Sequence, residues 1–180
     1  MRKHSAQLEA QFTAFYDAEA DAVFRYCLVR TSDREVSLDL VSGIFMRYFD
    51  ALVKGDVRGN ERAFLFTIAR NLLIDWYRKK KSLSLDAIVE EGEMEMDFPM
   101  EGTTQEDLER SADARLLVET IQKLEPSYRQ VVYLRFVEDL KPSEIAGVVG
   151  ESVNIVSVRI TRGVDKLRVL LKEKEGDNEI

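Results

Sequence analysis

Residues 142–172 read PSEIAGVVGESVNIVSVRITRGVDKLRVLLK, two stretches of helical pattern with a short break between them. Pro142 suits the first turn of a helix, Gly150 suits its end, and Ser152 can cap the longer helix that follows. Two helices joined by a glycine-containing turn have the spacing of a helix-turn-helix. This stretch therefore predicts a small helical domain whose last helix runs from about residue 153 to 172.

Apolar residues also recur at spacings of three and four along the N-terminal part of the chain, as in helices that pack on one another. We expect helices near residues 6–30, 34–53 and 61–80. The acidic stretch from Asp17 to Asp21 is a candidate break in the first of them. The helical period returns after Asp113, and Pro126 suits the start of a further helix. Because strand-like alternation is lacking, the predicted fold class is all-α.

The charge distribution divides the chain into three parts. Residues 1–81 carry 14 basic and 11 acidic side chains. Residues 82–112 carry one basic and ten acidic side chains, and residues 113–180 carry 11 basic and 12 acidic ones. Most of the net charge of −7 thus comes from the middle segment. We expect two small helical domains, residues 1–81 and 113–180, joined by an acidic flexible linker, residues 82–112.

The composition excludes several classes of protein. The single cysteine, Cys27, lies in an apolar pattern and the single histidine, His4, stands alone near the start, so we expect no disulfide and no metal site. No carboxylate pair, activated nucleophile or phosphate-binding glycine loop is evident, which predicts no catalytic residues, no cofactor and no enzymatic activity. The chain lacks an apolar run long enough for a membrane span or a signal peptide, so we expect a cytoplasmic protein with no membrane insertion.

The last predicted helix has two different sides. Its apolar side should pack on the preceding helices through Val153, Val156, Ile160, Gly163, Val164 and Leu167. Its other side carries Asn154, Ile155, Ser157, Val158, Arg159, Thr161, Arg162 and Lys166. Arginine and asparagine can make paired hydrogen bonds to guanine and adenine, and β-branched side chains can contact thymine methyl groups. This side of the helix therefore predicts DNA recognition in the major groove.

The predicted helix over residues 61–80 carries a second polar stripe. Thr67, Arg70, Asn71, Asp75 and Arg78 fall on one side of it, and four consecutive basic residues, 78–81, end it. Leu65, Ile68, Ala69, Leu72, Leu73 and Trp76 fall on the opposite side, where core packing is the simplest role for Trp76. A stripe of this kind fits contacts to a phosphate backbone and to unpaired bases.

Two motifs carry a resemblance to a known family. Residues 70–78, RNLLIDWYR, resemble the ARNxxIDxxR signature of the second conserved region of bacterial sigma factors, particularly the extracytoplasmic function (ECF) class. Residues 124–136, LEPSYRQVVYLRF, followed by SEIA at 143–146, resemble the LPxxxRxVxxLRxxxxxSxxEIA pattern of the fourth region. Two motifs in the right order are more specific than either alone.

This resemblance implies a promoter-recognition subunit of RNA polymerase, with the clamp of the β′ subunit, the flap of the β subunit and promoter DNA as partners, under the control of an anti-sigma protein. By position, core polymerase would be bound by Asp39, Leu40, Ile44, Phe45 and Arg47. The minus-ten element would be bound by Asn60, Arg70, Asn71, Asp75, Arg78, Lys79 and Lys80, with the loop that includes Asn60 forming a pocket for an extruded base. The minus-thirty-five element would be bound by Ser152, Asn154, Ser157, Val158, Arg159 and Arg162.

The chain departs from the family pattern in both halves. Ser42 and Gly43 stand where glutamine and an acidic residue are usual, and Glu151, Ser157 and Asp165 replace positions that are commonly apolar or basic. Two other interpretations therefore remain: a two-domain regulator whose first domain senses a ligand or a signal, and a protein-interaction adaptor descended from a sigma factor. A dimeric regulator should protect two half-sites about one helical turn apart on DNA, whereas an adaptor should protect none.

Overall fold

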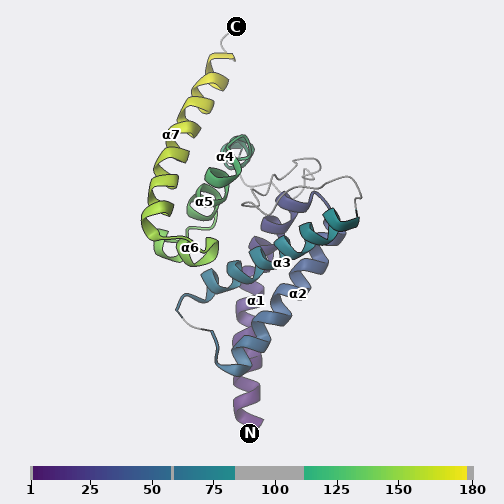
Figure 1. Cartoon of the computed structure of the whole chain (residues 1–180). Helices are drawn as coiled ribbons and strands as arrows, with labels where there is room; N and C mark the ends of the chain where they lie inside the picture. The colour runs from purple at the N-terminus through teal and green to yellow at the C-terminus, as the bar shows by residue number, and fades with distance from the viewer. Residues whose placement is uncertain (1, 58, 84–111, 178–180) are drawn as a thin grey trace. The chain divides into compact units, whose positions relative to one another are not determined.

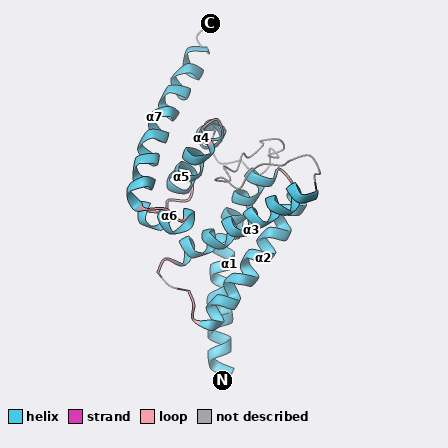
Figure 2. Cartoon of the chain, in the orientation of Figure 1, coloured by secondary structure: helices cyan, strands magenta, loops and turns pink. Residues whose placement is uncertain are grey.

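The protein is described by a computed structural model that places residues 2–57, 59–83 and 112–177. It divides into two compact units, residues 1–92 and 93–180 (Figure 1). Over the placed residues the regular structure is entirely helical, which confirms the all-α prediction (Figure 2). None of the helices in these ranges is long and apolar enough to cross a membrane. The predicted acidic linker lies almost entirely outside the described residues.

The first unit is built from three helices that pack on one another, α1 (Arg2–Thr31), α2 (Arg34–Lys54) and α3 (Glu61–Leu83). These bounds agree with the three helices expected from apolar periodicity. Aromatic rings fill much of the α1–α2 contact, where the Phe12 ring lies 4.9 Å from that of Phe49 and the Phe15 ring 4.6 Å from that of Tyr48. The fully buried residues include Val23, Tyr26, Ile44, Tyr48, Leu65, Phe66, Ala69 and Leu73.

The candidate break between Asp17 and Asp21 is absent, because α1 continues through this stretch. Two alanines alternate with the acidic residues there, and alanine is the strongest helix former. Glu19 also has a partner, since Arg62 of α3 donates a hydrogen bond to its carboxylate at 2.7 Å. Helix propensity and the contact with α3 thus both favour a continuous helix, which the structure shows where an interruption was expected.

Polar side chains fix the two connections within the first unit. Asp33 caps α2 by accepting a hydrogen bond from the backbone N–H of Val36 at 3.1 Å. Gly55 ends α2 with a φ of 73°, a left-handed conformation that favours glycine. Asn60 caps α3 by accepting a hydrogen bond at its Oδ1 from the N–H of Ala63 at 2.9 Å. These caps set where α2 and α3 begin.

The second unit contains α4 (Ala112–Gln122), α5 (Pro126–Phe136), α6 (Pro142–Val149) and α7 (Val153–Asp177). The predicted starts at Pro126 and Pro142 are confirmed. Gly150 ends α6 with a φ of 76°, and the Ser152 Oγ caps α7 by accepting a hydrogen bond from the N–H of Ile155 at 3.3 Å. The last helix extends beyond the predicted end at residue 172. The helix-turn-helix is therefore present, with the helix boundaries around its turn at the predicted residues.

Helix α5 is the centre of the second unit, because α4, α6 and α7 all pack on it. Its Val131, Val132 and Leu134 are buried, together with Ile145 of α6 and Val156 of α7. The buried Arg129 side chain donates to the backbone oxygen of Leu124 from Nε at 3.1 Å and from Nη2 at 2.8 Å. Both bonds tie α5 to the turn before it and so hold the platform on which α7 rests.

Candidate nucleic-acid interface

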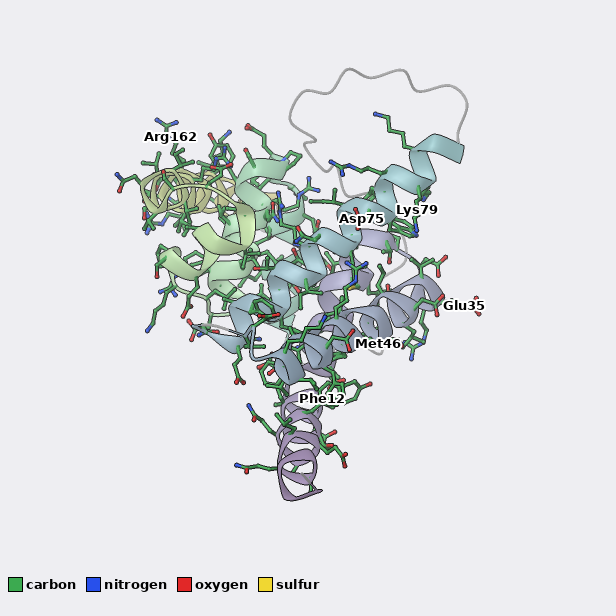
Figure 3. All side chains as sticks on the ribbon, turned by 60° about the horizontal axis from the view of Figure 1, so that its bottom comes forward. Phe12, Glu35, Met46, Asp75, Lys79 and Arg162 are labelled. Carbon is green, nitrogen blue, oxygen red and sulfur yellow. The ribbon has the colours of Figure 1, made fainter. Side chains whose placement is uncertain are left out.

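Helix α7 presents an exposed polar and β-branched face. Val156, Gly163 and Leu167 are buried against the rest of the unit, as expected. Residues of the predicted reading side are exposed: Asn154, Ile155, Ser157, Val158, Thr161, Arg162 and Lys166. Arg162 points away from the ribbon of α7 (Figure 3). Side chains able to contact base edges therefore lie where a DNA groove could reach them.

The packing expectation fails for one residue of α7. Val153, predicted on the apolar side, is 44% exposed, because it lies in the first turn of the helix, immediately after the cap Ser152. Ile155 and Val158, 46% and 49% exposed, flank the same end of the helix. Three exposed β-branched residues thus gather at its N-terminal end, which is the part of a recognition helix that enters the major groove.

Arg159 differs from its neighbours because it has an acidic partner. Its Nη1 lies 2.7 Å from Oε1 of Glu151, the first residue after the glycine that ends α6. The two side chains are only 33% and 28% exposed, so water screens this ion pair less than a fully exposed one. Of the six residues predicted to bind the minus-thirty-five element, Arg159 is the one that is half-buried.

Other cations of α7 are also paired with acids. Lys166 Nζ lies 2.6 Å from Oε1 of Glu125, and its hydrogen bond to that carboxylate raises the pKa of Lys166. Arg168 Nη1 lies 3.3 Å from Oδ1 of Asp165. These pairs offset part of the positive charge of the helix, which lowers its general attraction for phosphates and leaves relatively more of the recognition to individual side chains.

Helix α3 carries the predicted polar stripe on its outer side. Asn71, Asp75, Arg78, Lys79 and Lys80 are exposed, whereas Arg70 is half-buried. Asp75 and Lys79 lie along α3 in Figure 3. The stripe ends in basic side chains next to an aromatic pair, because the Trp76 and Tyr77 rings lie 4.8 Å apart and Lys80 Nζ lies 5.0 Å from the Trp76 ring.

Trp76 is half-buried instead of fully enclosed in the core. Its neighbour Tyr77 is anchored, since its hydroxyl donates a hydrogen bond to the backbone oxygen of Arg30 in α1. The opposite side of α3 buries Leu65, Ala69 and Leu73, as predicted, with Ile68 and Leu72 partly covered. The tryptophan therefore lies at the border between the core and the basic end of the stripe.

Asn60, predicted in a pocket for an extruded base, is exposed at the start of α3 and also caps that helix. Its Oδ1 is engaged by the backbone of Ala63. A contact that Asn60 makes to a base therefore has to be compatible with this cap or to replace it.

The five residues of α2 predicted to bind polymerase do not form one surface. Asp39 and Arg47 are exposed, but Leu40, Ile44 and Phe45 are buried in the core with 9%, 0% and 2% of their surface exposed. Phe45 instead contacts Tyr16 of α1, with ring centroids 4.6 Å apart. In the first unit these three side chains hold α2 in place, and their direct contact with a partner stays a prediction.

A different set of apolar residues lies on the outside of α2, and the motif comparison missed it. Leu38, Met46 and Val53 are 48%, 70% and 55% exposed. Together with the exposed Glu35, Asp39 and Asp50 they form what we call the α2 stripe. Figure 3 labels Met46 and Glu35 on this helix. The sequence contains the pattern that predicts this stripe. On a helical wheel Leu38, Met46 and Val53 lie on one side of the helix, each within about one-sixth of a turn of the same line.

Two family models match the chain, one for each unit. The model of sigma-70 region 2 matches residues 15–83, and that of sigma-70 region 4 matches residues 114–167. The matched residues include all of α3 and the helix-turn-helix of α6 with the first half of α7. The chain belongs to the sigma-70 family.

Several curated relatives of this sigma-70 family chain are ECF RNA polymerase sigma factors. BldN of Streptomyces coelicolor is 29% identical over 163 residues, which is 90% of this chain and 61% of the relative. SigL of Mycobacterium tuberculosis is 28% identical over 165 residues, covering 91% of this chain and 90% of the relative. SigW of Bacillus subtilis is 29% identical over 167 residues, covering 90% of this chain and 89% of the relative. The resemblance to the ECF class is therefore confirmed across both units.

Solved structures agree with the fold assignment. The sigma factor RpoE in complex with the anti-sigma factor NepR, from Bartonella quintana, matches with a TM-score of 0.68 at 20% identity, over 90% of this chain and 97% of that one. CnrH in complex with the cytosolic domain of CnrY matches with a TM-score of 0.60 at 25% identity, over 93% of this chain and 94% of that one. The first of these likenesses concerns the fold alone.

Proposed function

We propose that this protein binds core RNA polymerase and directs it to promoters, with α7 reading the minus-thirty-five element and α3 the minus-ten element. The observation that carries this proposal is the presence of two different polar helix faces in two separate family-matched units. One face is suited to a DNA groove, and the other combines basic side chains with an aromatic pair suited to unpaired bases. The polymerase supplies the catalysis, and the setting is the cytoplasm.

The α2 stripe is the proposed contact with the β′ clamp, in place of the buried Leu40, Ile44 and Phe45. Met46 is 70% exposed in the middle of this stripe, which also carries acidic side chains, and exposed apolar residues with polar ones at their edge are typical of an interaction surface. The exposed Asp39 and Arg47 remain candidates for polar contacts at its edge. The β flap is the proposed partner of the second unit.

Control by an anti-sigma protein is part of the proposal. It is supported by the family membership and by the similarity to CnrH, whose structure holds it in complex with the cytosolic domain of CnrY. Such a protein would act most simply by covering the α2 stripe, the α7 face or both. We therefore expect core polymerase and the anti-sigma protein to compete for binding to this protein.

The test is run-off transcription with purified core polymerase, this protein and DNA from upstream of its own gene. Lys79→Ala and Arg162→Ala should lower promoter-dependent initiation while polymerase binding is retained, whereas Met46→Glu should weaken polymerase binding itself. Lys172→Ala and Val169→Glu are matched controls, because both residues are exposed on the later turns of α7. Polymerase binding without initiation on any promoter would favour the adaptor, and no polymerase binding would favour the two-domain regulator.

A further inference from the structure

The ion pair between Glu151 and Arg159 spans the turn of the helix-turn-helix and the second turn of α7. Glu151 follows Gly150, the left-handed residue that ends α6, and its own N–H donates to the backbone oxygen of Ala146 at 3.1 Å. The backbone of Glu151 is therefore fixed by the fold. Its carboxylate in turn holds Arg159 Nη1 at 2.7 Å.

The remaining edge of the Arg159 guanidinium has the geometry needed for base recognition. Arginine carries five N–H donors in a planar fork, and the Glu151 bond occupies one nitrogen, Nη1. The Nε and Nη2 groups remain as two parallel donors on one edge. A pair of parallel donors matches the O6 and N7 acceptors of guanine in the major groove.

The carboxylate should stay with Arg159 when DNA approaches. Both side chains are about two-thirds buried, and among the described residues Oε2 of Glu151 is buried without a hydrogen-bond partner. Removing Arg159 from this site would leave a partly desolvated carboxylate without its counter-charge, which is unfavourable. An arginine that is already oriented also loses less side-chain freedom when it binds a base.

We propose that Glu151 is a positioning residue that holds Arg159 to read one guanine of the minus-thirty-five element, and that it trades general DNA affinity for sequence discrimination. This inference rests on the proposed promoter-binding function. The negative charge of Glu151 opposes phosphate binding near the turn, so it lowers affinity for all sequences alike. The same charge fixes the arginine, so it raises the preference for guanine at a single position.

The experiment uses holoenzyme assembled from core polymerase and the full-length protein, bound to a pool of promoter duplexes randomised across the minus-thirty-five element. The base preference at each position is measured by sequencing the bound and unbound fractions. Arg159→Ala should lower the ratio of guanine to the other bases at one position by about tenfold or more, since one paired contact contributes that much discrimination. Glu151→Ala should reduce the preference at the same position by roughly three- to tenfold and leave the other positions unchanged.

Two further variants separate orientation from charge. Glu151→Gln keeps an acceptor oxygen but removes the charge. It should therefore retain more of the guanine preference than Glu151→Ala does, while the two variants bind random DNA equally well. Asp165→Asn removes an acid that pairs with Arg168 on the same helix, and it should raise binding to random DNA without changing any base preference. Thermal unfolding of each variant establishes that the domain is folded.

The possible results are distinct. An effect of Arg159→Ala with no change in Glu151→Ala would overturn the positioning role and leave the proposed function standing. A uniform loss over all sequences in Arg159→Ala would place this arginine on a phosphate and overturn the discrimination. A wild-type holoenzyme with no preference in the randomised segment would contradict the proposed function itself, and with it the inference.

Discussion

Gly163 of α7 lies so close to Val132 of α5 that a Cβ atom added to the glycine would be 2.5 Å from Cγ2 of the valine. The same atom would lie 3.4 Å from Cβ of Tyr128. The absence of a side chain at this position therefore sets how closely the recognition helix approaches its platform.

Gly163→Ala is expected to destabilise the second unit. Relieving the overlap requires α7 to shift or Val132 to leave its rotamer, and overpacking of this kind costs about 1–3 kcal/mol. Urea unfolding followed by circular dichroism measures the change in free energy. A variant more stable than the wild type by the roughly 1 kcal/mol that alanine gains over glycine inside a helix would show that the overlap is relieved at no cost, contrary to the packing described.

Gly43→Ala should have the opposite effect on the first unit. An added Cβ at Gly43 would lie 3.7 Å from Cδ1 of Leu72, an ordinary contact, and alanine is favoured over glycine inside a helix by roughly 1 kcal/mol. We expect a gain of about 0.5–1 kcal/mol in the free energy of unfolding. Measuring core-polymerase affinity of the same variant tests whether the unusual Ser42-Gly43 pair weakens that contact, and an unchanged affinity would separate stability from binding.

Asn60 is predicted to have two roles that substitution can separate. Asn60→Ala removes the cap of α3 and should cost about 1 kcal/mol of stability. Asn60→Asp keeps an acceptor for the Ala63 N–H, so it should be nearly as stable as the wild type, but it lacks the amide donors. If the amide binds an extruded base, both variants should form fewer open promoter complexes, as measured by permanganate reactivity. Normal opening by Asn60→Asp would assign the residue to capping alone.

Cys27 should resist alkylation in the folded protein. Burial raises the pKa of its thiol to about 12, although the nearby Arg30 partly opposes the shift, so little reactive thiolate forms at pH 8. Iodoacetamide should label the native protein slowly and the urea-unfolded protein at the rate of a free thiol. Because the unfolded thiol loses its proton first, this group should reduce stability as pH rises from about 9 toward 12. Rapid labelling of the native protein would show that α1 opens locally around Cys27.

Local sequence signals were reliable where a residue acts through its own backbone. Pro126, Pro142, Gly150 and Ser152 mark helix boundaries because proline restricts φ, glycine adopts the left-handed conformation, and a serine oxygen accepts from a nearby N–H. These effects involve residues close in sequence. The helix-turn-helix could accordingly be predicted with its turn in place.

Surface assignments were less reliable because they depend on which helices meet. Leu40, Ile44 and Phe45 lie in the helix that the family resemblance assigns to polymerase binding, but a resemblance by position does not distinguish residues that touch a partner from those that support the helix. Packing of α2 on α1 and α3 buries these three and leaves Met46 outside. Val153 is a similar case, since its position in the first turn of α7 takes it beyond the reach of the core.

The sequence by itself determined that this protein is all-helical, that its two halves carry sigma-factor motifs, and where most of its helices begin and end, because periodicity, caps and breakers are local properties. Only the tertiary structure decided which side of α2 is free, that α1 continues past Asp21, and that Glu151 holds Arg159. Those features depend on burial and on distances between side chains that are far apart along the chain or on different elements. Such distances are set by the packing of helices against each other, which no single helical pattern contains.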